Sequence, residues 1–158
     1  MFAVEKLIKL ALEEDVGSGD ITTAHLIKPD QQGHAHIIAK EPLVLAGLDI
    51  ARRVFKSLNP NIRFIPLASD GDEIVAAATI VEVTGGMQTL LTGERTALNF
   101  LQRLSGIATM VREYVQVVAM HNIQLVDTRK TTPGWRVLEK YAVRIGGAAN
   151  HRMGLYDG

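Results

Sequence analysis

The end of the chain constrains the fold most, because two short apolar runs there flank a segment with helical periodicity. The runs are Ile123–Val126 and Gly147–His151, and the segment between them is Pro133–Ile145. A strand, a helix and a second strand at this spacing are typical of a βαβ unit, in which the two strands are parallel neighbours. The sequence therefore predicts an α/β architecture here, with Ile123–Val126 as a buried strand and Gly147–His151 as a second, short strand.

Cationic side chains follow both predicted strands. Asp127, Thr128, Arg129 and Lys130 follow the first strand directly, and His151 and Arg152 follow the second. In parallel α/β folds the carboxyl ends of neighbouring strands, about 4.8 Å apart, meet at one edge where functional residues gather. Arg matches a carboxylate or phosphate with a planar fork, and Lys supplies a movable charge. The sequence predicts a site for a small, multiply charged anion.

A plainer alternative treats these cations as members of surface ion pairs. Asp127 would then pair with Arg129, and Arg152 with Asp157. This alternative does not explain why both strand ends are cationic, so we favour the anion site.

The distribution of charge agrees with that choice. Residues 1–94 hold 8 Lys and Arg against 13 Asp and Glu, whereas residues 95–158 hold 9 against 4. The chain as a whole is neutral, so no global field draws it to nucleic acid or to an anionic membrane. Interleaved basic residues can equally form a solvated helix face.

Arg95 is a further candidate for the anion site. We expect it in the first turn of a long helix capped by Thr92, where the helix dipole disfavours a cation. A cation there makes better sense if it shares an incoming anion with the helix N-terminus, although a solvated Arg without a role is equally compatible. The same helix is predicted to break or kink at Ser105-Gly106.

The first part of the chain predicts a mixed structure. A helix that contains Val4 and Leu12 should end before Gly17. Short apolar or alternating runs between residues 34 and 83 indicate strands, and residues 46–58 indicate a helix among them. We therefore expect an N-terminal α+β sandwich.

Several classes of function are disfavoured by composition. The chain has no cysteine, which excludes disulfides and thiolate chemistry. Its N-terminal residues carry charges throughout, unlike a signal peptide, and no run approaches the roughly 18 apolar residues of a membrane span. We expect no membrane partner and a cytoplasmic location.

His34 and His36 alternate on one predicted strand face, but two ligands without a third do not indicate a metal site.

Four segments together resemble the quinolinate phosphoribosyltransferase family. They are EDVGSGDITT, TGERTALNFLQRLSGIAT, DTRKTTPG and GGAANHRMGLYD, and they run in the family's order from Glu14 to Asp157. The pairing of DTRKTTPG with NHRMGLYD at this separation is highly specific. The resemblance implies an N-terminal α+β sandwich domain (residues 1–110) and the beginning of an incomplete α/β barrel (residues 111–158), of which only the first βαβ unit is present. It also implies a dimer.

The resemblance implies an activity and roles for individual residues. Quinolinate and phosphoribosyl pyrophosphate would give nicotinate mononucleotide, pyrophosphate and carbon dioxide, with Mg²⁺, in NAD biosynthesis. Arg129, His151 and Arg152 would contact the quinolinate carboxylates, and Thr128 would line the same pocket. Arg95 would reach the quinolinate of the neighbouring subunit. Lys130 would lie close to both substrates as the catalytic residue.

The chain departs from the family in length. Family members continue further and supply the Mg²⁺ ligands and the phosphate-binding loops, so we expect these ligands outside this chain and no turnover by residues 1–158 alone. Two alternatives remain. One is a non-catalytic remnant that binds a partner subunit or a small dicarboxylate. The other is a related phosphoribosyltransferase-like protein linked to molybdenum transport. The intact DTRKTTPG and NHR segments favour the quinolinate enzyme over this relative.

Overall fold

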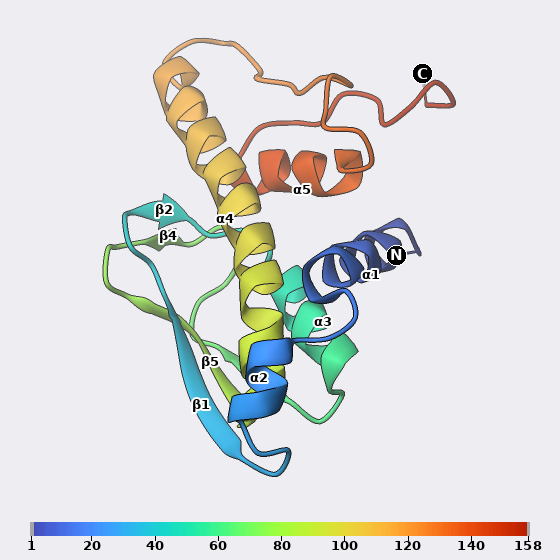
Figure 1. The fold of residues 1–158 in the computed structure, drawn as a ribbon. Helices are drawn as coiled ribbons and strands as arrows, with labels where there is room; N and C mark the ends of the chain where they lie inside the picture. The colour runs from blue at the N-terminus through green and yellow to red at the C-terminus, as the bar shows by residue number, and fades with distance from the viewer. Residues whose placement is uncertain (1, 158) are drawn as a thin grey trace.

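A long helix, α4 (Met87–Val118), extends through the molecule and packs against most of the other elements (Figure 1). The computed structural model describes residues 2–157. The remaining elements, in chain order, are α1 (Phe2–Val16), α2 (Ile21–Leu26), β1 (Gln32–Ile38), β2 (Leu43–Val44), α3 (Leu48–Leu58), β3 (Arg63–Pro66), β4 (Glu73–Ile74), β5 (Thr79–Gly86) and α5 (Arg136–Gly146). The predicted mixed α/β class is confirmed.

The main sheet is antiparallel and has the strand order β1-β5-β3, while β2 and β4 pair separately. Residues alternate between its two faces along β1. Ala35 and Ile37 pack toward the core, whereas His34 and His36 are exposed on the other face. One face of the sheet is therefore covered by helices and the other is open.

The helices predicted in the first part of the chain are present. The stripe Val4, Ile8 and Leu12 of α1 is buried, and α1 ends at Val16, one residue before Gly17. Helix α3 buries Val54 and Phe55 between α1, α4 and the sheet. The core of the molecule lies where α3 and α4 cross the covered face of the sheet.

Two predictions about α4 are wrong. The helix begins at Met87, directly after β5, so Thr92 is not its cap; the Thr92 hydroxyl instead donates to Asp20 Oδ2 at 3.2 Å. The helix also continues unbroken through Ser105-Gly106. The hydroxyl of Ser105 hydrogen-bonds the backbone N and O of Ala46, so this small residue lets α4 pack closely against that segment.

The two predicted strands near the end of the chain are reduced to a single parallel bridge between Val126 and Ala149. Ala149 N donates to Leu125 O at 3.0 Å, and Asp127 N donates to Ala149 O at 3.2 Å. The parallel juxtaposition is as expected, but the buried strand is not, because Ile123 is 59% exposed and Val126 is 45% exposed. No third strand flanks the pair within the described residues, and an isolated pair is marginal.

The helix between these segments, predicted over Pro133–Ile145, is α5 and begins three residues later, at Arg136. No helix among residues 2–157 is both long and apolar enough to span a membrane.

Candidate anion-binding site

A buried ion pair brings the two cationic segments together. Lys140, on α5, has a side chain that is only 1% exposed, and its Nζ donates to Asp127 Oδ1 at 2.5 Å and to the carbonyl of His151 at 2.8 Å. The amide of His151 donates to the same Asp127 oxygen at 2.7 Å. With its amide nitrogen turned inward, Asn150 donates to Asp127 Oδ2 at 3.0 Å. Asp127 and Lys140 thus hold the loop after residue 126 against the loop after residue 149.

Arg136, in the first turn of α5, forms a second link between the same loops. Its Nη1 donates to the Met153 carbonyl at 3.0 Å, and its Nη2 donates to the Arg129 carbonyl at 3.3 Å. Its Nε donates to Thr131 Oγ1 at 3.2 Å. Because one planar guanidinium contacts both segments, the backbone positions of Arg129 and Arg152 are fixed relative to each other.

The loop between Asp127 and α5 is also ordered internally. Thr128 Oγ1 accepts a hydrogen bond from Lys130 N at 3.0 Å, which makes a local turn. Trp135 stacks on Phe100 of α4 with ring centroids 5.1 Å apart, and this anchors the end of the loop on the core. The Thr128 hydroxyl therefore serves the loop in this structure.

Glu139 connects this loop to α4. Its carboxylate accepts from Arg103 Nη2 at 2.8 Å and from the amide of Thr132 at 3.2 Å. Burial pushes the pKa of Glu139 upward, but the hydrogen bonds from Arg103 and Thr132 outweigh burial, so the pKa lies below its ordinary value. Glu139 is therefore held as a carboxylate, and this anchors the loop electrostatically.

The predicted site side chains are left without protein partners. Among residues 2–157, no hydrogen bond or ion pair is made by the side chains of Arg129, Lys130, His151 and Arg152. The alternative ion pairs are absent: Asp127 binds Lys140, and Asp157 accepts from the amide of Met153. The buried carboxylate of Asp127 pairs with Lys140 and not with the cations of the candidate site. Those cations therefore remain available to an anion.

Arg95 is not brought to this cluster. It is the ninth residue of α4 rather than in its first turn, so the argument from the helix dipole does not hold. Its side chain is exposed and makes no hydrogen bond or ion pair with the described residues. Arg103, which does contact the loop, lies eight residues further along α4, about 12 Å along the helix axis.

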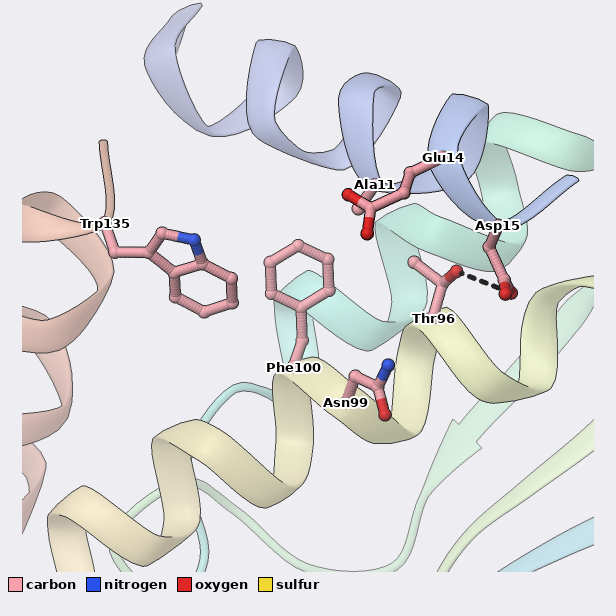
Figure 2. A pocket seen from close by; sticks show the side chains of 7 residues that line it. All are labelled: Ala11, Glu14, Asp15, Thr96, Asn99, Phe100 and Trp135. Atoms are coloured by element: carbon pink, nitrogen blue, oxygen red, sulfur yellow. Dashed lines mark hydrogen bonds between the residues drawn. The ribbon is translucent and has the colours of Figure 1, made fainter. Parts of the chain in front are cut away.

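A cavity of about 300 Å³ lies between α1, α4 and Trp135, and Figure 2 shows the side chains around it. Its polar lining includes the carboxylates of Glu14 and Asp15, and Asp15 accepts from Thr96 at 3.3 Å. Two carboxylates repel an anion. This cavity therefore does not serve the anion site, although it lies beside the loop that Trp135 anchors.

Sequence reasoning missed the residues that build the site. Lys140, Arg136 and Glu139 lie on α5 with their polar groups turned to the two loops. Charged residues on a helix usually lie on a solvated face, so these three residues were not expected to be buried or to contact the loops. The available signal was the position of Lys140 beside Leu138 and Ala142, both buried on the same helix.

Both parts of the chain match models of one protein family. The family described as quinolinate phosphoribosyl transferase, N-terminal domain, matches residues 20–105, and the corresponding C-terminal domain matches residues 107–158. The chain belongs to the quinolinate phosphoribosyltransferase family. The resemblance carried by DTRKTTPG and NHRMGLYD is thereby confirmed.

Individual relatives in this family agree. The chain is 51% identical over 146 residues to a probable nicotinate-nucleotide pyrophosphorylase (carboxylating) of Synechocystis sp., covering 92% of this chain and 49% of the relative. It is 46% identical over 155 residues to the Bacillus subtilis protein of that name, covering 98% and 53%. The chain thus spans about half the length of the curated relatives it matches.

Solved structures of the family superpose closely on this chain. NadC from Streptococcus pyogenes matches with a TM-score of 0.95 and 43% identity, covering 99% of this chain and 57% of that one. The nicotinate-nucleotide pyrophosphorylase from Francisella tularensis matches with a TM-score of 0.93 and 42% identity, covering 99% and 56%. The arrangement of elements described above is therefore that of the family.

Proposed function

We propose that the protein carrying this chain is a quinolinate phosphoribosyltransferase, a pentosyltransferase of NAD biosynthesis. It joins quinolinate to the ribosyl group of phosphoribosyl pyrophosphate and forms nicotinate mononucleotide, pyrophosphate and carbon dioxide. The observation that carries the proposal is the set of unpartnered cations Arg129, Lys130, His151 and Arg152 on two loops clamped by Lys140 and Asp127. Family membership and the names of the relatives support it.

The cations suit quinolinate because that ligand is a planar ring with two adjacent carboxylates. In this proposal Arg129 and Arg152 bind carboxylates with their planar forks, and His151 adds a donor beside them. Fixing both carboxylates determines which way the ring nitrogen faces, and this is the atom that must meet the ribose carbon. The clamp through Arg136 keeps the two arginine-bearing loops at a constant separation.

Lys130 is the proposed catalytic residue, next to the carboxylate site and within reach of the second substrate. The ribosyl transition state is cation-like, so positioning and stabilisation of the leaving pyrophosphate carry most of the rate. Once the ring nitrogen is bonded to ribose it is cationic, and this favours loss of carbon dioxide from the adjacent carboxylate. Thr128 shapes the loop that presents Lys130, since the Thr128 hydroxyl accepts a hydrogen bond from the backbone amide of Lys130.

Mg²⁺ is part of the proposed reaction, but the described residues do not fit it. Among residues 2–157, only His34, His36 and Glu82 form a group of three or more His, Asp or Glu side chains close enough to share an ion. Mg²⁺ prefers oxygen ligands, whereas imidazole suits transition metals. We therefore assign no Mg²⁺ ligand to this chain.

The assembly, the domain division and the compartment belong to the same proposal. We place an N-terminal sandwich in residues 1–110 and the first βαβ unit of an incomplete barrel in residues 111–158. The protein is a homodimer in which Arg95 acts across the interface, and the side chain of Arg95 is exposed and unpartnered as such a role requires. It binds neither nucleic acid nor membrane and works in the cytoplasm.

Quinolinate binding to the full protein tests the proposal. Arg129→Ala should weaken quinolinate binding by about 100-fold or more, because removing one member of a buried charge-assisted pair costs roughly 3 kcal/mol. Isothermal titration calorimetry measures this directly. Arg144→Ala, an exposed arginine at the end of α5, is the matched control and should bind like the wild type. Equal affinity of the Arg129→Ala variant and the wild type would overturn the assignment.

A further inference from the structure

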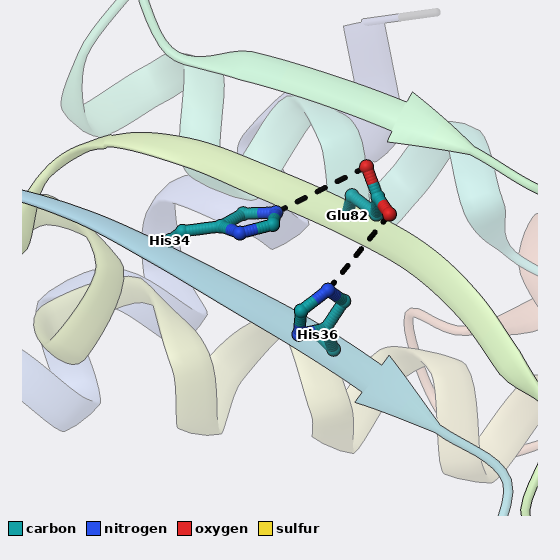
Figure 3. A group of neighbouring side chains, drawn as sticks. All are labelled: His34, His36 and Glu82. Atoms are coloured by element: carbon teal, nitrogen blue, oxygen red, sulfur yellow. Dashed lines mark ion pairs between the residues drawn. The ribbon is translucent and has the colours of Figure 1, made fainter.

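Three metal-ligating side chains converge on the open face of the main sheet, away from the anion site. Figure 3 shows His34 and His36 of β1 turned toward Glu82 of β5. His34 Nε2 lies 4.0 Å from Glu82 Oε2, and His36 Nε2 lies 3.8 Å from Glu82 Oε1. One ligand atom from each residue can be chosen so that all three lie within 4.8 Å of one another.

The convergence follows from strand geometry. Side chains at positions i and i+2 of a strand point to the same face, which places His34 beside His36. The register pairs His36 directly with Glu82 across the antiparallel ladder, and His34 is then its diagonal neighbour. The three residues are fixed on two hydrogen-bonded strands rather than on a loop.

We propose that His34, His36 and Glu82 form a binding site for a divalent transition metal ion of the zinc class. An ion bound about 2.0–2.2 Å from imidazole nitrogen and carboxylate oxygen needs ligand atoms roughly 3.3 Å apart. With one ligand atom from each residue, all three atoms lie within 4.8 Å of one another, so each pair must close by at most about 1.5 Å. Side chains that are 37–47% exposed can make this adjustment by rotation about their side-chain torsions.

The carboxylate of Glu82 is not hydrogen-bonded to either imidazole in this structure. Neither imidazole is within hydrogen-bond distance of the carboxylate, because 3.8 and 4.0 Å exceed the usual 2.7–3.2 Å. Two imidazoles and one carboxylate also form the donor set of many zinc centres, which keep a fourth position for water or another ligand. Mg²⁺ does not choose two imidazoles, so this site is chemically different from the Mg²⁺ of the proposed reaction.

The metal site does not depend on the proposed transferase activity. It lies on β1 and β5, while the cationic loops lie beside α5. The sequence shows no third ligand beside His34 and His36, and the strand register supplies that ligand, Glu82. A bound ion would crosslink two neighbouring strands of the sheet.

Zinc titration of the metal-free purified chain tests the proposal. Isothermal titration calorimetry with Zn²⁺ should show one site per chain, and His36→Ala and Glu82→Gln should each weaken it at least about tenfold, the lower bound seen when even an outer partner of a metal ligand is removed. His121→Ala removes an exposed histidine outside the cluster and is the matched control. The His121→Ala variant should bind Zn²⁺ with the affinity of the wild type.

Two further readings separate loss of the site from loss of the fold. The unfolding temperature without metal should be the same for the wild type and the three variants. At the same concentration of Zn²⁺ it should rise less for His36→Ala and Glu82→Gln than for the wild type and His121→Ala. Co²⁺ should give visible absorption bands from a nitrogen- and oxygen-ligated ion in those same two proteins. Zinc affinity that is unaffected by His36→Ala and Glu82→Gln, or the absence of binding to the wild type, would overturn the proposal.

Discussion

Asp127 is a structural anchor, although its position directly after a predicted strand resembles that of a functional residue. Its two oxygens accept hydrogen bonds from Lys140, from the amide of His151 and from Asn150. Its side chain is only 8% exposed. A buried carboxylate with three donors holds the loops in place, and the cations beside it are the residues that we propose contact the ligand.

This arrangement predicts a large loss of stability when Lys140 is changed. Lys140→Met should lower the free energy of unfolding by about 3–5 kcal/mol, because it leaves the Asp127 carboxylate buried without its cation. Urea denaturation measures the change. Lys130→Met, which changes an exposed residue in the loop after Asp127, should alter the free energy of unfolding by no more than about 0.5 kcal/mol.

A double variant separates the ion pair from packing. Lys140→Met combined with Asp127→Asn should recover part of the loss, since no uncompensated charge then remains buried. A loss below about 1 kcal/mol for Lys140→Met alone would contradict the assigned role of the pair.

Residue by residue, the sequence predicted the cations of the candidate site but not the side chains that hold their loops. The cations of DTRK and NHR stand out because their types and positions after apolar runs have few structural explanations. Lys140 could not be recognised, because its burial depends on Asp127 and on the His151 carbonyl, which come from other parts of the chain. A side chain whose role is defined by long-range contacts carries little local signal.

The contact between α4 and α5 sets where the site is built. Gly146, at the end of α5, lies so close to α4 that an added Cβ would be 2.6 Å from the Ala108 carbonyl oxygen and 2.6 Å from Val111 Cβ. Arg112 of α4 donates to the carbonyls of Gly146 and Ile145 and so caps the end of α5. Helix α5 therefore rests on α4 at a separation that only glycine permits.

Two glycines on these helices make a matched pair of variants. Gly146→Ala should lower the free energy of unfolding by about 1–3 kcal/mol, because the new methyl group forces α5 away from α4. Gly106→Ala should raise it by about 0.5–1 kcal/mol, because its Cβ would meet nothing within 4 Å and alanine favours the helix. Thermal and urea denaturation of both variants check the opposite signs. A stabilised Gly146→Ala variant would contradict the close packing.

Elements were predictable where their apolar stripes were complete. Helices α1, α3 and α5 show such stripes, and all three are present. The start of α4 was misplaced because Thr92 resembles a cap, while its hydroxyl bonds Asp20, a contact made across the fold. Residues 123–126 have the composition of a strand, but strands need partners, and within residues 2–157 only Ala149 pairs with them.

For the whole molecule, the proposed use of Arg95 across a dimer interface has a direct test. Mixing Arg95→Ala subunits with Arg129→Ala subunits should restore about a quarter of wild-type activity at statistical assortment, because each mixed dimer then contains one intact site. Steady-state formation of nicotinate mononucleotide by the full protein measures this recovery.

Each variant alone should be inactive or nearly so and serves as the control. If Arg95 acts within its own subunit, no mixed dimer contains an intact site and activity does not return. Analytical ultracentrifugation of each variant should show the dimer, and a monomer would contradict the proposed assembly.

The helix α4 joins the two family domains without a linker. The matches end at residue 105 and resume at residue 107, and both positions lie inside one helix of 32 residues, about 48 Å long. Arg95 and Arg112 are consequently held about 26 Å apart along a single rigid rod. Hinge bending between these two halves would therefore have to break backbone hydrogen bonds in the middle of α4. If the site is shared between subunits as proposed, rotation of one subunit against the other would open or close it while leaving α4 intact.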